Sequence, residues 1–151
     1  RQQFWSHQEY LDFPFVSLID KIGMHSIVLE ADIAGNYVVS SYSWASTRDW
    51  ARFGQLYLDN GKWNEEQIFS PKWVDYITEP TLHSKGTYGA HFWLNAEGKY
   101  PDVPKDLFSC NGYQGQYVFV IPSKSLVVVR TGLGENPTFD VNAFLSEVVN
   151  N

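Results

Sequence analysis

The segment Phe108-Ser109-Cys110-Asn111-Gly112-Tyr113-Gln114-Gly115-Gln116 runs directly into two apolar stretches, residues 117–121 and 126–130. Valine and isoleucine in these stretches fit a pleated strand, while Pro122-Ser123-Lys124-Ser125 between them is typical of a turn. The pattern predicts an antiparallel hairpin behind a glycine-rich segment. The two glycines of that segment would let the backbone approach a ligand closely and offer bare N–H groups to an anion. The simpler alternative is a glycine-rich turn between two core strands, because a short glycine motif alone is a weak signal.

The hairpin is expected to belong to a three-stranded antiparallel meander, with strands near residues 106–110, 116–121 and 125–131. A last helix is predicted from Asn136-Pro137, with apolar residues at i, i+3, i+4, i+7 and i+8, which are Val141, Phe144, Leu145, Val148 and Val149. Such a stripe needs a sheet to cover. We therefore expect the helix to pack on the meander, with a further strand at 89–94 between loops at 82–87 and 96–106.

For the first half of the chain, the sequence predicts mainly helices. Ser46 can cap a helix that carries Asp49 in its first turn and apolar residues at helical spacing up to Asn60-Gly61. Ser70-Pro71 starts another helix, whose inner side is expected to carry Trp73, Val74 and Ile77. A short helix over 16–22, ending at Gly23, and a short strand at 37–39 complete the prediction.

Composition excludes several classes of function. The 151 residues suffice to bury a core, and the rings that make up 17% of them are interpreted mainly as core, with an aromatic-lined cleft as the alternative. A net charge of -6 without any basic run argues against a nucleic-acid partner. The single cysteine precludes an internal disulfide, and the four histidines lack metal-ligand spacing, so neither metal nor cofactor is expected. No apolar stretch approaches the roughly 18 to 20 residues of a membrane span.

Several motifs in the same order resemble the serine β-lactamase-like hydrolases: Ile22-Gly23-Met24, the helix with its flanks at 46–63, Tyr88-Gly89, and the glycine-rich segment. That superfamily includes class C β-lactamases, penicillin-binding proteins, family VIII esterases and 6-aminohexanoate-dimer hydrolases, and the chain is most similar to the last. The resemblance extends from about residue 15 to the C-terminus. It implies an α/β (α+β) fold of the β-lactamase/transpeptidase type, in which an antiparallel sheet is packed with helices.

Two catalytic motifs of that superfamily are missing. No serine is followed three residues later by lysine, as Ser-x-x-Lys requires, and Tyr42 lies downstream of Gly23-Met24, whereas the family's Tyr-x-Asn-like motif lies upstream. Tyr42 is therefore interpreted as a packing or surface residue. We expect the chain, which begins with Arg1, to be the C-terminal portion of a longer hydrolase cut after the tyrosine motif. It would form a single partial domain, with helices and loops over about 1–87 and sheet strands plus a last helix over about 88–151. Alone, it is predicted to be inactive.

The resemblance also implies roles at the glycine-rich segment. Cys110-Asn111-Gly112 matches the family's Lys/His-Thr/Ser-Gly strand motif, which makes these three residues candidates for substrate binding. The following backbone N–H, that of Tyr113, would then be one of the two oxyanion donors. Cys110 replaces the cation that binds the carboxylate of β-lactams, which disfavours these antibiotics and leaves esters and linear amides. With no histidine nearby in the sequence, Cys110 is interpreted as a buried, inert thiol and not as a nucleophile.

Other polar residues near these motifs receive structural interpretations. Asn111 could donate its amide to a substrate or only fix the strand end, and Gln116 is expected to be a surface glutamine. Arg48, Asp49 and Arg52 are interpreted as a structural ion-pair cluster at a helix start.

Two functions remain open on the sequence. The first is one wall of a serine hydrolase that cleaves an ester, amide or β-lactam through an acyl-serine intermediate. The second is a noncatalytic binding module of the same fold. Expected partners are a small acyl substrate and either the missing N-terminal segment or a second copy, paired through the strand edge at 126–129. The family's usual habit suggests a periplasmic or secreted protein, but the sequence leaves the compartment undecided.

Overall fold

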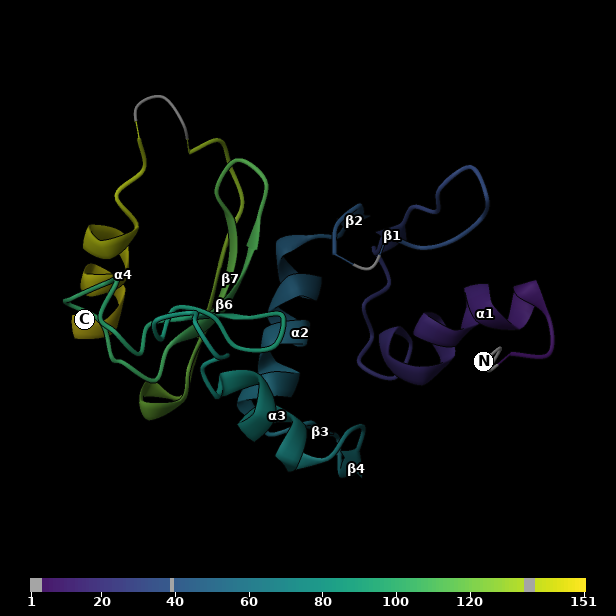
Figure 1. Cartoon of the computed structure of the whole chain (residues 1–151), viewed down its shortest axis with the longest axis horizontal. Coiled ribbons are helices and arrows are strands. Elements are labelled where there is room, and N and C mark those ends of the chain that lie inside the picture. The colour runs from purple at the N-terminus through teal and green to yellow at the C-terminus, as the bar shows by residue number, and fades with distance from the viewer. Residues whose placement is uncertain (1–3, 39, 135–137) are drawn as a thin grey trace.

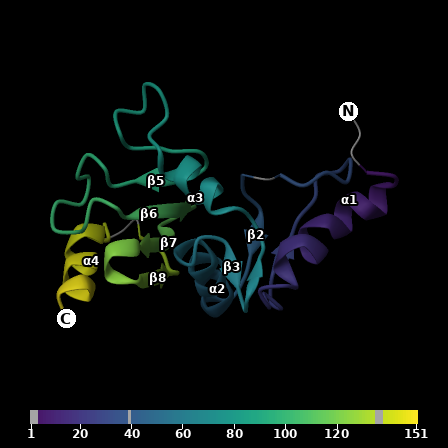
Figure 2. The same ribbon diagram turned by 90° about the horizontal axis from the view of Figure 1, so that it is seen from below.

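The computed structural model of the protein describes residues 4–38, 40–134 and 138–151. Its helices are α1 (His7–Pro14), a π-helical turn that continues it (Phe15–Ile19), α2 (Thr47–Leu58), α3 (Pro71–Thr78) and α4 (Val141–Asn150). Its strands are β1 (Val28–Leu29), β2 (Ser43–Trp44), β3 (Lys62–Trp63), β4 (Glu66–Gln67), β5 (Trp93–Leu94), β6 (Phe108–Gly112), β7 (Gln116–Ile121) and β8 (Leu126–Arg130). Figure 1 shows α4 and α2 on either side of the main sheet, with α1 beyond α2. The view at 90° in Figure 2 gives the same order.

The main sheet is antiparallel, with strand order β5-β6-β7-β8. It confirms the predicted hairpin, whose strands are joined by a 3-10 turn (Pro122–Lys124). The first strand of the predicted meander lies two residues later than expected, because a turn bond from Leu107 N–H to the carbonyl of Pro104 still occupies the preceding segment. The strand predicted at 89–94 is reduced to β5, since Gly89 N–H bonds to the carbonyl of Phe92 and turns the chain there.

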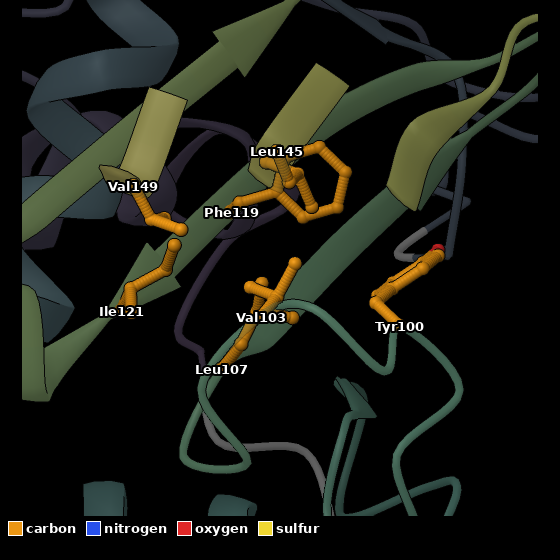
Figure 3. Close-up of a cluster of buried hydrophobic side chains, with 7 residues drawn as sticks. All are labelled: Tyr100, Val103, Leu107, Phe119, Ile121, Leu145 and Val149. Carbon is orange, nitrogen blue, oxygen red and sulfur yellow. The ribbon is translucent and has the colours of Figure 1, made fainter. Parts of the chain in front are cut away.

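Alternation along the strands gives the sheet two buried faces. On one face, β7 and α4 pack together with the loop that precedes β6, as Figure 3 shows for Tyr100, Val103, Leu107, Phe119, Ile121, Leu145 and Val149. This confirms that the apolar stripe of the last helix covers the sheet. The opposite face packs on α3, through Phe92, Leu94, Phe108 and Val120 against Val74 and Ile77. Each of these large side chains stabilises the fold by about 1.5 to 3 kcal/mol through burial.

Helix α2 begins where the sequence predicts. The Ser46 hydroxyl accepts a hydrogen bond from Asp49 N–H, and the helix ends at Leu58, just before Asn60-Gly61. Its close contact with the sheet depends on Gly54, where an added Cβ would lie 2.6 Å from Val127 Cγ1 and 3.0 Å from Val118 Cγ1. The side chains of β7 and β8 therefore approach the backbone of α2 directly.

Several local predictions were wrong. The helix expected over 16–22 is confirmed only in part: helical structure starts earlier, at His7 with the Ser6 hydroxyl as its cap, and ends at Ile19. Turns then lead to Gly23, which adopts a positive φ of 71° as expected. Instead of a strand at 37–39, Tyr37 forms only an isolated bridge to Ala31, and Val39 lies outside the described residues. The last helix is capped by Asp140, while Asn136-Pro137 also lies outside the described residues. Trp73 is not on the inner side of α3, since it is 39% exposed and its ring packs on Tyr76.

Candidate functional site

The candidate site lies at the end of β6, where this strand has an open edge. On one side β6 pairs with β7 along its whole length, from Phe108 to Gly112. On the other side β5 pairs only with Phe108 and Ser109. Within the described chain, the outer edge of β6 from Cys110 to Gly112 is therefore without a strand partner. Such an edge offers backbone N–H and C=O groups to an extended ligand.

Cys110 projects to the face of the sheet that packs on α3. Its side chain is half-buried against the cluster around Phe108 and Val120. Burial raises the pKa of this thiol to about 12, so it is protonated at neutral pH. A protonated thiol is a poor nucleophile, which agrees with the interpretation of an inert cysteine. The cation that β-lactamase-like enzymes place at this motif position has no counterpart in Cys110.

Asn111 faces the other way, toward α4. Its Oδ1 accepts a hydrogen bond of 2.8 Å from the hydroxyl of Ser109, which is buried. This bond fixes the end of β6. Cys110 and Asn111 thus lie on opposite faces, so a ligand resting on one face of the sheet could meet only one of the two side chains.

The backbone N–H of Tyr113 comes directly after β6, at the tip of the β6–β7 hairpin. The Tyr113 side chain is 82% exposed. Among the described residues, no hydrogen bond occupies this N–H. The chain then turns through Gln114 and Gly115, whose φ angles are 57° and 83°. The predicted oxyanion donor is therefore a free N–H beside the open edge of β6.

Gln116 is not the surface glutamine that was expected. It is half-buried, its Nε2 donates a 2.7 Å hydrogen bond to the carbonyl of Gly132, and its Oε1 accepts a 3.0 Å bond from Gly132 N–H. This side chain joins the hairpin tip to the segment after β8. Little in the sequence indicates these hydrogen bonds, because a glutamine beside glycine is usual in exposed turns.

Trp93 and Arg130 were missed by the sequence interpretation. Trp93 of β5 lies opposite Ser109, is 42% exposed and packs edge-to-face on Tyr88 at 5.1 Å between ring centroids. An aromatic surface therefore borders the open edge of β6. Arg130, at the end of β8, donates hydrogen bonds to carbonyls around the hairpin tip.

The polar cluster at the start of α2 has a structural role. Asp49 is 3% exposed and accepts bonds of 2.7 Å from Ser26 N–H and 2.6 Å from the Ser26 hydroxyl, and it pairs with Arg52. Hydrogen bonding from Ser26, helped by the charge of Arg52, lowers the pKa of Asp49 below its ordinary value despite burial. Through the hydrogen bonds from Ser26 to Asp49, this cluster links the segment that follows Gly23-Met24 to the start of α2. Arg48 is exposed and takes no part in this ion pair.

Other hollows of the surface do not coincide with this edge. A groove of about 290 Å³ lies near the opposite end of β6, between α3 and Pro122, and none of its lining residues belongs to the candidate site. Among the described residues, no three His, Cys, Asp or Glu side chains gather closely enough to hold a metal ion. No helix in the described part of the chain is long and apolar enough to cross a membrane.

Comparison with known proteins places the fold. No family model and no curated protein matches the sequence. A solved structure from Bacillus anthracis, assigned as a 6-aminohexanoate-dimer hydrolase, is similar with a TM-score of 0.68 and 24% sequence identity, over 89% of this chain and 35% of that chain. A protein from Bacteroides dorei DSM 17855, assigned as a β-lactamase, has a TM-score of 0.62 and 16% identity, over 91% of this chain and 50% of that one.

The present chain thus spans between about a third and a half of the length of these two proteins. Both matches cover most of this chain. Together with the predicted order of motifs, they identify the fold: the chain has the α/β fold of the β-lactamase-like hydrolases and corresponds to the C-terminal portion of that fold.

Proposed function

We propose that this chain forms one wall of the active site of a serine hydrolase that cleaves esters or linear amides through an acyl-serine intermediate. The observation that carries the proposal is the free Tyr113 N–H beside the unpaired edge of β6. The nucleophilic serine and its base would come from an N-terminal half with the Ser-x-x-Lys and Tyr-x-Asn motifs. We call the protein that joins both halves the parent protein.

In the proposed reaction, the serine hydroxyl attacks the carbonyl carbon while the partner lysine and tyrosine take up its proton. The carbonyl oxygen becomes an oxyanion and receives a hydrogen bond from Tyr113 N–H. A second donor would be the backbone N–H of the serine itself. One preorganised donor of this kind stabilises the transition state by about 3 to 4 kcal/mol. When the intermediate collapses, the bond to the leaving oxygen or nitrogen breaks and that atom receives the proton, which releases the alcohol or amine. Water then hydrolyses the acyl-serine, which frees the acid and restores the serine hydroxyl.

The side chains at the edge of β6 favour substrates without a carboxylate at the recognition position. Cys110 is neutral and half-buried, and Asn111 is engaged by Ser109. Neither side chain offers the positive charge that a β-lactam carboxylate would need. Trp93 and Tyr113 instead present exposed rings beside the edge, which suits acyl groups with an apolar body.

Hydrolysis assays test this proposal. The isolated 151-residue chain should not hydrolyse nitrocefin or p-nitrophenyl esters above the rate in buffer, whereas the parent protein should turn over p-nitrophenyl esters. Loss of the parent's turnover on replacing the Ser-x-x-Lys serine by alanine would support the acyl-serine route. Saturable turnover by the isolated chain, abolished by one Ser→Ala change within it, would contradict the proposal.

A noncatalytic binding module is the second candidate. The same unpaired edge of β6, flanked by the exposed rings of Trp93 and Tyr113, could add an extended peptide as a further strand. A parent protein that lacks turnover but shows peptide-dependent protection of the 110–112 amides from exchange would favour this function over hydrolysis.

A further inference from the structure

Arg130 supports the tip of the β6–β7 hairpin through hydrogen bonds made from the α4 face of the sheet. It pairs with Tyr117 across the β7–β8 ladder, which places it on the α4 face of the sheet, opposite to the Cys110 side chain. Its guanidinium donates from Nη1 to the carbonyl of Gly115 and, at 3.4 Å, to that of Gly132. From Nη2 it donates to the carbonyl of Leu133 at 3.3 Å. One side chain thus joins the hairpin tip to the segment that follows β8.

The guanidinium is itself held in place. Its central carbon lies 3.8 Å from the centroid of the Phe139 ring, so the flat group stacks on that ring. Gly115 also leaves room for it, because an added Cβ there would lie 3.0 Å from Nη1. Two further links run in parallel: the paired bonds between the Gln116 side chain and Gly132, and a 3.0 Å bond from Gly134 N–H to the carbonyl of Gln114.

The turn needs such support. Gln114 and Gly115 both have positive φ angles, and for a glutamine this left-handed conformation is unfavourable. The bonds from Arg130 and Gly134 engage the carbonyls of these two residues, which fixes the Gln114–Gly115 and Gly115–Gln116 peptide planes, the two that follow the Tyr113–Gln114 peptide. The groups that hold the turn come from β8, from the segment after it and from Gln116 at the start of β7, and in the described chain none of them bonds to the Tyr113 N–H.

We propose that Arg130, assisted by Gln116, is a positioning residue that sets the direction of the Tyr113 N–H toward the reacting carbonyl. This inference rests on the proposed function and adds a residue that does not itself touch the substrate. An oxyanion donor must point at the place where charge develops, and a small misplacement removes most of its effect. Arg130 would therefore contribute to the chemical step and little to substrate binding.

The test uses the parent protein with Arg130→Met, Arg130→Lys and Gln116→Glu, and with Lys124→Met in the turn between β7 and β8 as the charge-matched control. We expect Arg130→Met to lower kcat by about 10-fold or more with KM nearly unchanged. Lysine can reach one carbonyl but cannot fork or stack, so Arg130→Lys should recover only part of the loss. Gln116→Glu sets a carboxylate against the Gly132 carbonyl and should also lower kcat. The Lys124→Met variant should behave as the wild type.

Amide exchange in the same variants provides a readout that does not depend on catalysis. In Arg130→Met, the Gly132 and Gly134 N–H groups should exchange about 10-fold faster, while amides of the β7–β8 ladder keep their protection. If Arg130→Met does not fold, kcat and amide exchange of the Arg130→Lys and Gln116→Glu variants test the inference instead. Unchanged kcat in folded variants, or a loss of kcat without faster exchange at the turn, would overturn the inference. A wild-type parent without turnover would instead refute the proposed function, and the exchange data alone would then decide whether Arg130 orders the turn.

Discussion

Under the proposed function, single residues at the end of β6 decide whether this edge can serve catalysis. Gly112 is opposite Gln116 in the ladder, and a Cβ added at Gly112 would lie 2.9 Å from Gln116 Cβ. Any larger side chain there pushes on the residue that links the hairpin tip to Gly132. The absence of a side chain at Gly112 therefore preserves the geometry of the turn and, under the proposed function, lets a ligand approach the backbone.

Replacing Gly112 by valine in the parent protein should lower kcat by about 10-fold or more. The branched side chain would displace Gln116 and, with it, the Tyr113 N–H. Steady-state kinetics with a p-nitrophenyl ester, together with thermal unfolding to establish that the variant is folded, measures the effect. Wild-type kcat in a folded Gly112→Val variant would mean that this segment is only a turn.

Asp49 gives a second prediction at the scale of the residue. Replacing Asp49 by asparagine should lower the free energy of unfolding at pH 7 by about 2 kcal/mol, because bonds to a buried carboxylate are lost. Since the folded-state pKa of Asp49 is lowered, its contribution is complete above the unfolded pKa near 3.9 and is lost as the pH falls through the folded value. Urea unfolding should therefore show a steeper loss of stability between about pH 5 and pH 3 in the wild type than in Asp49→Asn.

The exposed Asp75 of α3 provides the control for this measurement, since Asp75→Asn should leave both the stability and its pH dependence nearly unchanged. Equal acid sensitivity of wild type and Asp49→Asn would show that the Ser26 and Arg52 contacts do not stabilise the fold.

At the scale of helices and strands, the sequence correctly predicted the features that are determined by residues adjacent in the chain. The caps at Ser46 and Ser70 and the valine-rich runs of β7 and β8 depend on neighbouring residues, and all are present. The pairs β1–β2 and β3–β4 were missed because strands of two residues have no measurable period. In the β3–β4 turn, Asn64 and Glu65 take positive φ angles without the glycine that usually marks such a hairpin.

The candidate site was predictable in the same uneven way. Gly112 and Tyr113 could be selected from the sequence because they lie in a glycine-rich segment, and the resemblance to the β-lactamase-like hydrolases supported that choice. The bracing role of Arg130 depends on a contact with Gly115, fifteen residues away in the sequence. An arginine at the end of a strand has no pattern of its own that would have indicated this contact.

The packing of α2 on the sheet yields a prediction about an element. Gly54→Ala adds a methyl group that would lie 2.6 Å from Val127 Cγ1, and stiff valine side chains cannot easily give way. Alanine gains up to about 1 kcal/mol in helix propensity, but overpacking costs about 1 to 3 kcal/mol. We expect a net loss of about 1 kcal/mol in the free energy of unfolding, measured with urea.

A double-mutant cycle with Val127→Ala separates the two terms. The shortened side chain should relieve part of the clash, so the combined loss should be smaller than the sum of the single losses. Additive losses, or a stabilised Gly54→Ala, would contradict the close contact between α2 and β8.

At the scale of the whole molecule, neighbouring hydrophobic clusters have residues in common, while the main sheet of the described chain ends in a strand with one unpaired edge. A third buried cluster consists of Ile19, Ile22, Met24 and Leu56. Phe53 and Phe69 pack both against it and against the cluster of Phe108 and Val120 on the α3 face of the sheet, which supports the proposal that the chain forms a single partial domain. β8 is the last strand of the main sheet in the described chain. Its run Leu126-Val127-Val128-Val129 is apolar and contains three β-branched valines, so it is a template for pairing with a further strand.

We therefore expect the isolated chain to associate through β8, or to bind the N-terminal half of the parent when this is supplied as a separate chain. Analytical ultracentrifugation at tens of micromolar should show a mass that rises with concentration, and adding the N-terminal half should replace self-association by a one-to-one complex. A stable monomer whose 127–129 amides are all protected from exchange would mean that the chain closes its own sheet.

The central claim, that this chain is the donor wall and not the nucleophile-bearing part of a serine hydrolase, is tested most directly by labelling with a fluorophosphonate and locating the adduct by mass spectrometry. The account predicts one adduct on the parent protein, at a serine outside residues 1–151, and none on the isolated chain. A fluorophosphonate adduct on a serine within residues 1–151 would contradict it.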